Sequence, residues 1–306
     1  MQLAVNRHAS KATRETWTFH HLTDVHADDS DFARDEFEAR VKEIKDDPHA
    51  IWLGGGDYGS LILPEDKRFA THAHEDVHRI PDAYVESVTE LFLPIRHKCV
   101  GWGIGNHEDT VYRRYHRGVG AEIARNLGVA DRYLGVRGWS VNQFMLHERR
   151  ITLKLYWWHG WSAGRLKGRK ALQAERDLSA WDADVLLLGH DHQPYYDIWF
   201  TEECYPTRSG WALKQVPRAV INGGSWTYGQ RPPFDASTMK MSQIPNEKWA
   251  EGRNFRPQPP VNPKLLINLD YGNPKNDKNG AKGRPAGFSF EIRAHAETFY
   301  VGGFAA

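Results

Sequence analysis

The pattern of hydrophobic and polar positions predicts strands that alternate with amphipathic helices. Apolar, strand-like runs occur at residues 16–22, 50–53, 99–104, 151–157 and 184–188. Between them, apolar residues recur at spacings of three and four, which places them on one helix face. Helices are therefore expected around 32–44, 84–92 and 170–181. Alternation of this kind predicts a layered α/β domain, in which the chemistry collects in loops beyond the carboxyl ends of the strands.

The C-terminal third has a different pattern. Three more strand-like segments occur at 218–222, 265–269 and 288–292, whereas residues 230–263 are dense in Pro, Arg, Asn and Gln and show little periodicity. We expect a long loop there, which wraps the domain or lies near an active-site mouth. Without an internal repeat or a linker, the 306 residues are expected to form one domain. Its motif core would cover about 17–228, and a C-terminal loop and β extension would follow over about 229–306.

Composition excludes several classes of protein. A hydrophobic content of 40%, a charged content of 26% and a net charge of +1 are those of an ordinary globular chain, not of a disordered or collagen-like one. The two cysteines, Cys99 and Cys204, form neither a disulfide framework nor a metal-finger spacing. No apolar run is long enough for a signal peptide or a membrane span. These features predict a cytoplasmic protein without a membrane partner.

Histidine is the unusual residue, with 16 copies, and several of them follow the expected strands. The polar residues in these positions are Asp24 and His26, Asp57, Asn106 and His107, His159, and His190 with His192. Two residues at i and i+2 of an extended segment point to the same side, so each Asp-x-His or His-x-His pair is expected to face one ion. Carboxylate, imidazole and amide oxygen without thiolate suit Mn, Fe, Ni or Zn.

These five short motifs, in this order, resemble the signature of the calcineurin-like metallophosphoesterase superfamily. They are Asp-x-His, Gly-Asp, Gly-Asn-His-Glu, His and Gly-His-x-His, within residues 17–195. The later segment 222–228, followed by a Pro-rich stretch, resembles phage or prophage branches of that superfamily. The resemblance implies a four-layer α/β/β/α sandwich of two mixed sheets flanked by helices, with a dinuclear metal centre between the sheet ends.

The resemblance also implies a role for each motif residue. Asp24, His26 and His192 would hold a first metal ion. Asn106, His159 and His190 would hold a second, and Asp57 would bridge the two. The cofactors would be two divalent transition-metal ions, with Mn favoured over Fe, Ni or Zn, and they would activate a hydroxide. His107 would be the catalytic residue beside the scissile phosphate, and the sequence leaves open whether Glu108 or Asp109 orients it.

The implied function is metal-dependent hydrolysis of a phosphoric ester. A phosphodiester, in a nucleotide or nucleic acid, is favoured by the basic segment 160–170 and by Trp161 and Trp226, which could stack on a base. The acidic and arginine residues that follow these motifs in protein phosphatases are missing here. The alternatives are a phosphomonoesterase with the same centre and an inactive nucleic-acid-binding module. The substrate partner would be a phosphorylated small molecule or a nucleic acid, and the oligomeric state stays open.

Burial is the competing explanation for the aromatic residues and for any one histidine alone. Large aromatic side chains mainly serve the core, which applies to most of the 12 tryptophans. A single histidine such as His159, which follows two tryptophans, is more typical of a hydrogen-bonded core residue. The complete ordered set, and not any one member, therefore carries the functional hypothesis.

Overall fold

The structure is a computed structural model, and it describes residues 2–29, 32–64, 69, 80–147, 149–160, 172, 176, 180–207, 210–228, 262–272 and 286–293. Several sequence predictions fall outside these residues. They concern most of the expected helix at 170–181, the basic segment after Gly160 together with Trp161, and nearly all of the Pro-rich loop at 230–263.

One six-stranded sheet carries the first three motifs. Its strand order is β12-β11-β2-β3-β4-β5. The strands are β2 (Arg14–Leu22), β3 (Ala50–Gly55), β4 (Cys99–Gly103), β5 (Tyr133–Gly135), β11 (Lys264–Asp270) and β12 (Gly287–Arg293). Strands β2 to β5 run parallel to one another, while β11 pairs antiparallel with both β2 and β12. The sheet is therefore mixed, and its parallel half ends at one edge.

The second six-stranded sheet carries the last two motifs, and its order is β1-β6-β7-β8-β10-β9. The strands are β1 (Gln2–Ala9), β6 (Arg137–Leu146), β7 (Arg149–Trp158), β8 (Val185–Leu188), β9 (Tyr195–Thr207) and β10 (Gly210–Asn222). Strands β7, β8 and β10 are parallel neighbours, whereas β6 with β7 and β9 with β10 are antiparallel. This sheet is mixed as well.

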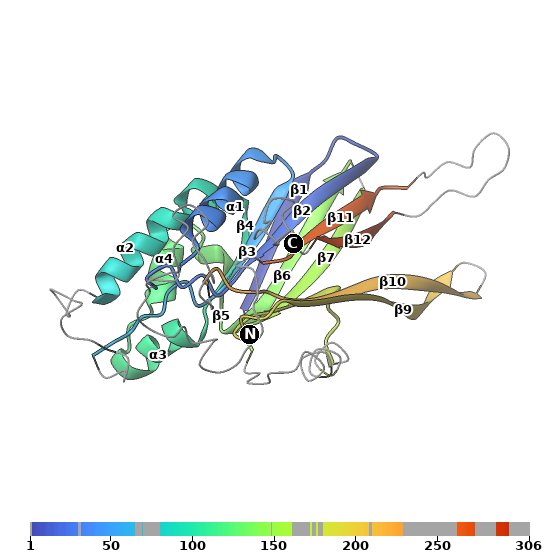
Figure 1. Cartoon of the computed structure of the whole chain (residues 1–306). Helices are drawn as coiled ribbons and strands as arrows, with labels where there is room; N and C mark the ends of the chain where they lie inside the picture. The colour runs from blue at the N-terminus through green and yellow to red at the C-terminus, as the bar shows by residue number, and fades with distance from the viewer. Residues whose placement is uncertain are drawn as a thin grey trace, which may run out of the picture.

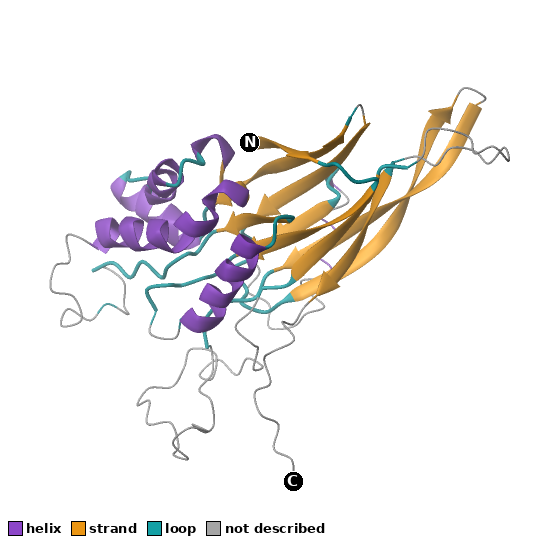
Figure 2. Cartoon of the chain, turned by 90° about the horizontal axis from the view of Figure 1, so that it is seen from above, coloured by secondary structure: helices purple, strands orange, loops and turns teal. Residues whose placement is uncertain are grey.

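The described helices gather on one side of the strands, as Figures 1 and 2 show. They are α1 (Arg34–Asp46), α2 (Ile80–Phe92), α3 (Asn106–Tyr115) and α4 (Val119–Asn126), with the 3-10 turns η3 (Leu93–Lys98) and η4 (Ala130–Arg132). Phe37 of α1 and Phe92 of α2 pack in one apolar cluster with Trp52 of β3 and Trp102 of β4. Pro94 lies in the first turn of η3, so α2 ends before it as expected.

A second apolar cluster fills the space between the two sheets. Phe19 and Leu53 come from one sheet, and Leu155 and Leu187 come from the other, and all four are fully buried. Alternate residues of β7 and β8 point the opposite way, so that Tyr156 and Leu186 join a third cluster on the outer face of that sheet. Two mixed six-stranded sheets with flanking helices confirm the predicted α/β class with two mixed sheets.

Strand β6 was not predicted, because part of its inward face is polar. Its burial alternates regularly along the strand, but Ser140 and Asn142 occupy buried positions where a hydrophobic pattern would have Val or Leu. Asn6 of β1 donates a hydrogen bond to the Ser140 hydroxyl and another to the Val100 carbonyl oxygen. Buried polar groups need such partners, and only the neighbouring strands supply them.

Candidate metal centre

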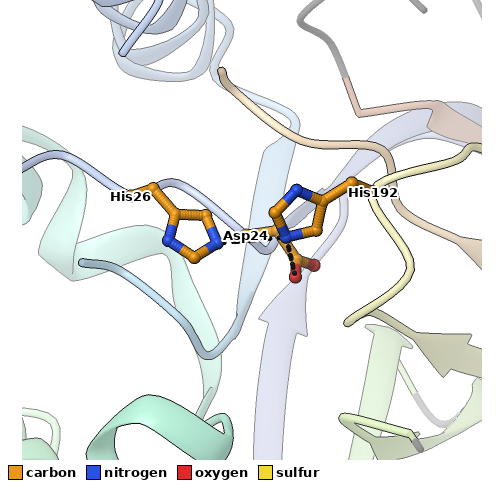
Figure 3. Close-up of side chains that lie close together, drawn as sticks. All are labelled: Asp24, His26 and His192. Atoms are coloured by element: carbon orange, nitrogen blue, oxygen red, sulfur yellow. Dashed lines mark hydrogen bonds and ion pairs between the residues drawn. The ribbon is translucent and has the colours of Figure 1, made fainter. Parts of the chain in front are cut away.

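The first group of candidate ligands joins the loop after β2 to the loop after β8. Asp24, His26 and His192 point toward one another in Figure 3. The Nε2 atoms of His26 and His192 lie 3.1 Å apart, and His192 Nε2 lies 3.4 Å from Asp24 Oδ1. These three residues are the set predicted to hold one ion, and the structure places them together.

The second group comes from the loops after β3, β7 and β8. Asp57, His159 and His190 offer ligand atoms within 4.8 Å of one another. His159 Nε2 lies 3.0 Å from Asp57 Oδ2 and 3.2 Å from Asn106 Oδ1, and His190 Nδ1 lies 2.7 Å from the same Asn106 oxygen. The amide oxygen of Asn106 thus faces two imidazole nitrogens, as the predicted second set requires.

Asp57 belongs to two groups of ligand atoms. It lies with His159 and His190, and also with His26 and His107. Because His26 is in turn a member of the first group, the Asp57 carboxylate stands between the two sets. Its Oδ2 atom faces His159 Nε2 at 3.0 Å and His107 Nε2 at 3.9 Å, while Oδ1 accepts a hydrogen bond from the His107 backbone N–H at 3.0 Å.

The backbone at the site departs from ordinary strand geometry. Five of the predicted ligands have left-handed φ values between 49° and 74°: Asp24, His26, Asp57, His190 and His192. Non-glycine residues adopt this region rarely, and such outliers cluster at functional sites. The prediction that these side chains alternate along an extended segment is therefore wrong, because sharp turns and not strand alternation set their directions. One consequence is that His190 and His192 face different groups instead of one ion.

Two glycines let the loops after β3 and β4 approach closely. A Cβ atom on Gly105 would lie 2.0 Å from Asp57 Oδ1, and one on Gly56 would lie 2.0 Å from the backbone nitrogen of Gly105. Gly56 also has a φ of +81°. The expected loop after β4 is short, since α3 begins at Asn106. Asn106 and His107 therefore lie in the first turn of a helix, where helical geometry sets their directions.

His107 takes its orientation from Ser60. Its Nδ1 lies 2.6 Å from the Ser60 carbonyl oxygen, and its Nε2 lies 3.9 Å from Asp57 Oδ2. Neither Glu108 nor Asp109, the two partners that the sequence left open, makes this contact: Asp109 pairs with Arg113 at 2.5 Å. A backbone carbonyl gives no signal in a sequence, so this partner could not have been found there.

Glu108 connects the loop after β3 with the loop after β4 through hydrogen bonds to their backbone. Its buried carboxylate accepts hydrogen bonds from the backbone N–H groups of Asp57, Tyr58 and Gly105 at 2.8 to 3.0 Å, and from the Tyr84 hydroxyl. Burial, and secondarily the charge of Asp57, raises the pKa of Glu108. One side chain thereby ties the loop after β3 to the first turn of α3.

The loop after β10 supports Asp24, a contact that the sequence did not predict. The Trp226 backbone N–H and the Ser225 hydroxyl both donate to the Asp24 carbonyl oxygen at 3.0 Å. The Trp226 side chain is 1% exposed, packs against Phe37 and donates from Nε1 to Asn262 Oδ1 at 2.6 Å. The hypothesis that Trp226 stacks on a base is therefore wrong, because its ring is part of the core.

Burial and mutual charge set the ionisation of the site. Burial raises the pKa of Asp24 to about 7, and burial lowers the pKa of His192 to about 3 and that of His26 well below the usual range. For His159, burial is outweighed by the Asp57 carboxylate, which raises the pKa to about 10. For Asp57, burial is likewise outweighed, and the charges of His159 and His107 hold its pKa well below its usual value.

The donor set fits divalent cations. His159 Nδ1 lies 2.8 Å from the Gly55 carbonyl oxygen, which can only accept, so Nδ1 carries a proton and the Nε2 lone pair points at oxygens of Asp57 and Asn106. The Nε2 lone pair of His159 and the oxygen lone pairs repel one another at 3.0 to 3.2 Å unless a positive charge lies between them. A second proton on Nε2 supplies that charge in the metal-free chain, and a divalent cation would supply it better. A carbonyl partner on the far ring nitrogen is also the usual way in which proteins orient a metal-ligating histidine.

No family model and no curated protein matches this sequence. A conserved uncharacterized protein and predicted phosphoesterase from Streptococcus pneumoniae has a similar structure at 11% identity and a TM-score of 0.33, covering 91% of this chain and 99% of that one. A metallophosphoesterase from Sphaerobacter thermophilus has 16% identity and a TM-score of 0.34, covering 78% and 93%. The fold follows from the strand pairings alone.

Among the described helices, none is long and apolar enough to cross a membrane.

Proposed function

We propose that this chain is a metallophosphoesterase of the calcineurin-like type, which hydrolyses a phosphodiester in a nucleotide or nucleic acid. The observation that carries the proposal is the place of Asp57, whose buried carboxylate is shared by two groups of buried or half-buried ligands. A structural metal site closes its coordination shell with protein ligands. Two adjacent sets bridged by one carboxylate are instead typical of dinuclear hydrolytic centres.

In this proposal Asp24, His26 and His192 hold one ion, and Asn106, His159 and His190 hold the other, with Asp57 between them. Two divalent ions bound there would neutralise charge on a phosphate and lower the pKa of a water molecule. Imidazole, carboxylate and amide oxygen donors without thiolate suit Mn, Fe, Ni or Zn, and we favour Mn. The ligands are buried or half-buried, so the protein holds them in place before any ion binds.

His107 is the proposed catalytic residue. Because the Ser60 carbonyl can only accept, Nδ1 of His107 must carry a proton, and Nε2 is the atom left to face the substrate. Neutral His107 therefore has a lone pair at Nε2 and can only accept there. To donate a proton to a leaving oxygen, His107 must carry a second proton at Nε2, the atom that lies 3.9 Å from Asp57 Oδ2.

Elemental analysis together with the Asp57→Asn variant tests the centre. The proposal requires two transition-metal ions per chain in the wild type, with occupancy and activity falling together in the variant. Asp131→Asn is a matched control, because this carboxylate is 73% exposed and pairs only with Arg132 among the described residues. A variant at Asp57 that keeps both ions and full activity would contradict the bridging role.

The choice of a diester is tested with two substrates. Hydrolysis of a bis-aryl and a mono-aryl phosphate would be compared with Mn added, and faster turnover of the diester is expected. Faster turnover of the monoester would favour the alternative, a phosphomonoesterase with the same centre. Salt-dependent binding of nucleic acid without hydrolysis under any of the four metals would instead favour an inactive binding module.

A further inference from the structure

Asn262 is a buried side chain that joins two segments distant from it in the sequence. It stands just before β11, the strand that lies beside β2 in Figure 1, and it is fully buried. Its Oδ1 atom accepts two hydrogen bonds, from the Thr23 backbone N–H at 3.0 Å and from the Trp226 indole at 2.6 Å. One amide oxygen therefore connects the residue that follows β2 with the loop after β10.

Both of these partners also hold Asp24. The Thr23 hydroxyl donates to Asp24 Oδ2 at 2.7 Å, and the Trp226 backbone N–H donates to the Asp24 carbonyl oxygen at 3.0 Å. Asp24 has a left-handed φ of 52°, a conformation that persists only where the surrounding contacts impose it. Asn262 thus fixes the two residues that hold this turn in place.

The backbone of Asn262 is fixed by a buried cation. Nη1 of Arg40, a residue that is 4% exposed, donates to the Asn262 carbonyl oxygen at 3.1 Å. The same guanidinium pairs with Glu43 through Nε at 3.1 Å, and Glu43 pairs in turn with Lys264, the first residue of β11. Helix α1 and the start of β11 therefore determine where the Asn262 side chain begins.

The Asn262 amide acts through its oxygen. Within the described part of the chain, its Nδ2 atom has no hydrogen-bond partner. A Cβ atom on Gly223 would lie 3.2 Å from that nitrogen and 2.2 Å from Thr23 Cγ2, so the loop after β10 packs closely here. No hydrogen bond among the described residues joins Asn262 to the three ligands predicted to hold the second ion. Its influence should therefore reach the first ion, which the Asp24 set would hold.

We propose that Asn262 is a positioning residue for this first metal ion. Through Thr23 and Trp226 it keeps the Asp24 turn in the conformation that directs the carboxylate at the ion. The segment that leads into β11 then belongs to the metal centre as well as to the sheet. The proposal rests on the proposed function, because it concerns one of the two ligand sets of the same centre.

Titration of the full chain with Co²⁺, followed by visible absorption, tests this role. His192→Ala and Asn106→Ala each lack a ligand of one set, so they show which step of the titration belongs to which ion. Asn262→Ala should weaken binding of the first ion about tenfold, at the lower end of the loss typical for a missing partner of a metal ligand, and should change the second step much less. Asn268→Ala is the matched control, because this asparagine of β11 accepts from the Thr16 hydroxyl in an exposed pair.

Two further variants separate positioning from folding. Asn262→Asp keeps an acceptor oxygen for both donors, with the Arg40 guanidinium nearby as a counter-charge, so it should bind the first ion more tightly than Asn262→Ala. Thr23→Val keeps the backbone N–H but removes the hydroxyl that donates to Asp24, so it should weaken the same step. Wild-type affinity for the first ion in Asn262→Ala, or in Thr23→Val where Asn262→Ala does not fold, would overturn the proposal. Equal losses at both steps would overturn it as well.

Hydrolysis of a bis-aryl phosphate separates this result from the proposed function. Two bound ions and cleavage of the ester, with wild-type affinity for the first ion in Asn262→Ala, would refute the positioning role alone. Selective weakening of the first ion in that variant, without cleavage of any ester by the wild type, would refute the hydrolytic function and leave the positioning role standing. A wild type that binds no Co²⁺ would overturn both.

Discussion

The backbone carbonyl of Ser60 accepts a hydrogen bond from His107 at 2.6 Å, while the hydroxyl of the same serine lies 2.9 Å from Nδ1 of His26. One residue thus orients both a candidate metal ligand and the candidate catalytic group. Asp28 holds Ser60 in turn, since its carboxylate accepts from the backbone N–H groups of Ser60 and Leu61. The two functions of Ser60 use different atoms, so substitution can separate them.

Removing the Ser60 hydroxyl should weaken metal binding and leave His107 in place. Ser60→Ala keeps the backbone carbonyl but deprives His26 of its partner, and lost partners of this kind typically cost about 10–100-fold in metal affinity. Competition titration with a chelating dye would measure the affinity. Ser87→Ala is the control, because that hydroxyl donates to the Tyr84 carbonyl oxygen within α2. Unchanged affinity in Ser60→Ala would show that His26 is not held through its Nδ1.

A methyl group on Gly105 should displace Asp57. Its Cβ would lie 2.0 Å from Asp57 Oδ1, so the loop after β3 or the start of α3 must move. Overpacking of this kind costs about 1–3 kcal/mol of unfolding free energy. We expect Gly105→Ala to lower both stability, measured by urea unfolding, and metal occupancy. Gly287→Ala is the matched control, since no atom of the described residues lies within 4 Å of a Cβ there. Full metal occupancy in Gly105→Ala would argue against the need for this close approach.

Stability should fall in mild acid because of His20. This side chain is fully buried in β2, and burial, with the charge of Arg40, keeps its pKa well below the usual 6.5. The folded chain keeps His20 neutral, whereas the unfolded chain takes up a proton as the pH falls below about 6.5. From pH 7.5 to pH 5.5, this one group should remove about 1.4 kcal/mol of unfolding free energy.

Urea unfolding of wild type and His20→Gln at both pH values measures that contribution. The variant is expected to have lower stability at pH 7.5 but a shallower loss toward pH 5.5, since it lacks the titrating group. Both proteins share every other buried histidine, so the difference between their pH dependences isolates His20. Parallel pH profiles would show that His20 is already protonated in the folded chain or does not titrate in the unfolded one.

The indole of Trp226 should matter for stability and not for substrate binding. Trp226→Phe keeps an aromatic ring in the core but removes the N–H that donates to Asn262. Asn262 Oδ1 keeps the Thr23 backbone N–H as a donor, so the lost hydrogen bond should cost about 0.5–1.5 kcal/mol. Thermal or urea unfolding would measure the loss, and Trp211→Phe is the control at a site that is 76% exposed. Weaker oligonucleotide binding in Trp226→Phe at unchanged stability would contradict the core assignment.

The sequence by itself determined which residue types carry the chemistry and where they fall along the chain. Each motif follows a strand with a strong apolar run, and parallel strands bring their carboxyl ends to one edge, so proximity of these loops was predictable. Asp24 with His26, and Asn106 with His159, lie together as the motif order implied. The assignment of metal ions to these groups stays a prediction.

Only the tertiary structure decided how the groups face one another. Left-handed turns at His190 and His192 send neighbours in the sequence to different ligand groups, and local periodicity carries no signal for such turns. The contact between His107 and the Ser60 carbonyl joins segments 47 residues apart, through a backbone atom that every residue has. In the sequence Trp226 stands in a loop, whereas in the structure it packs against Phe37 and donates a hydrogen bond to Asn262. Contacts of this kind depend on how the elements pack, and a hydrophobic pattern specifies only that they pack.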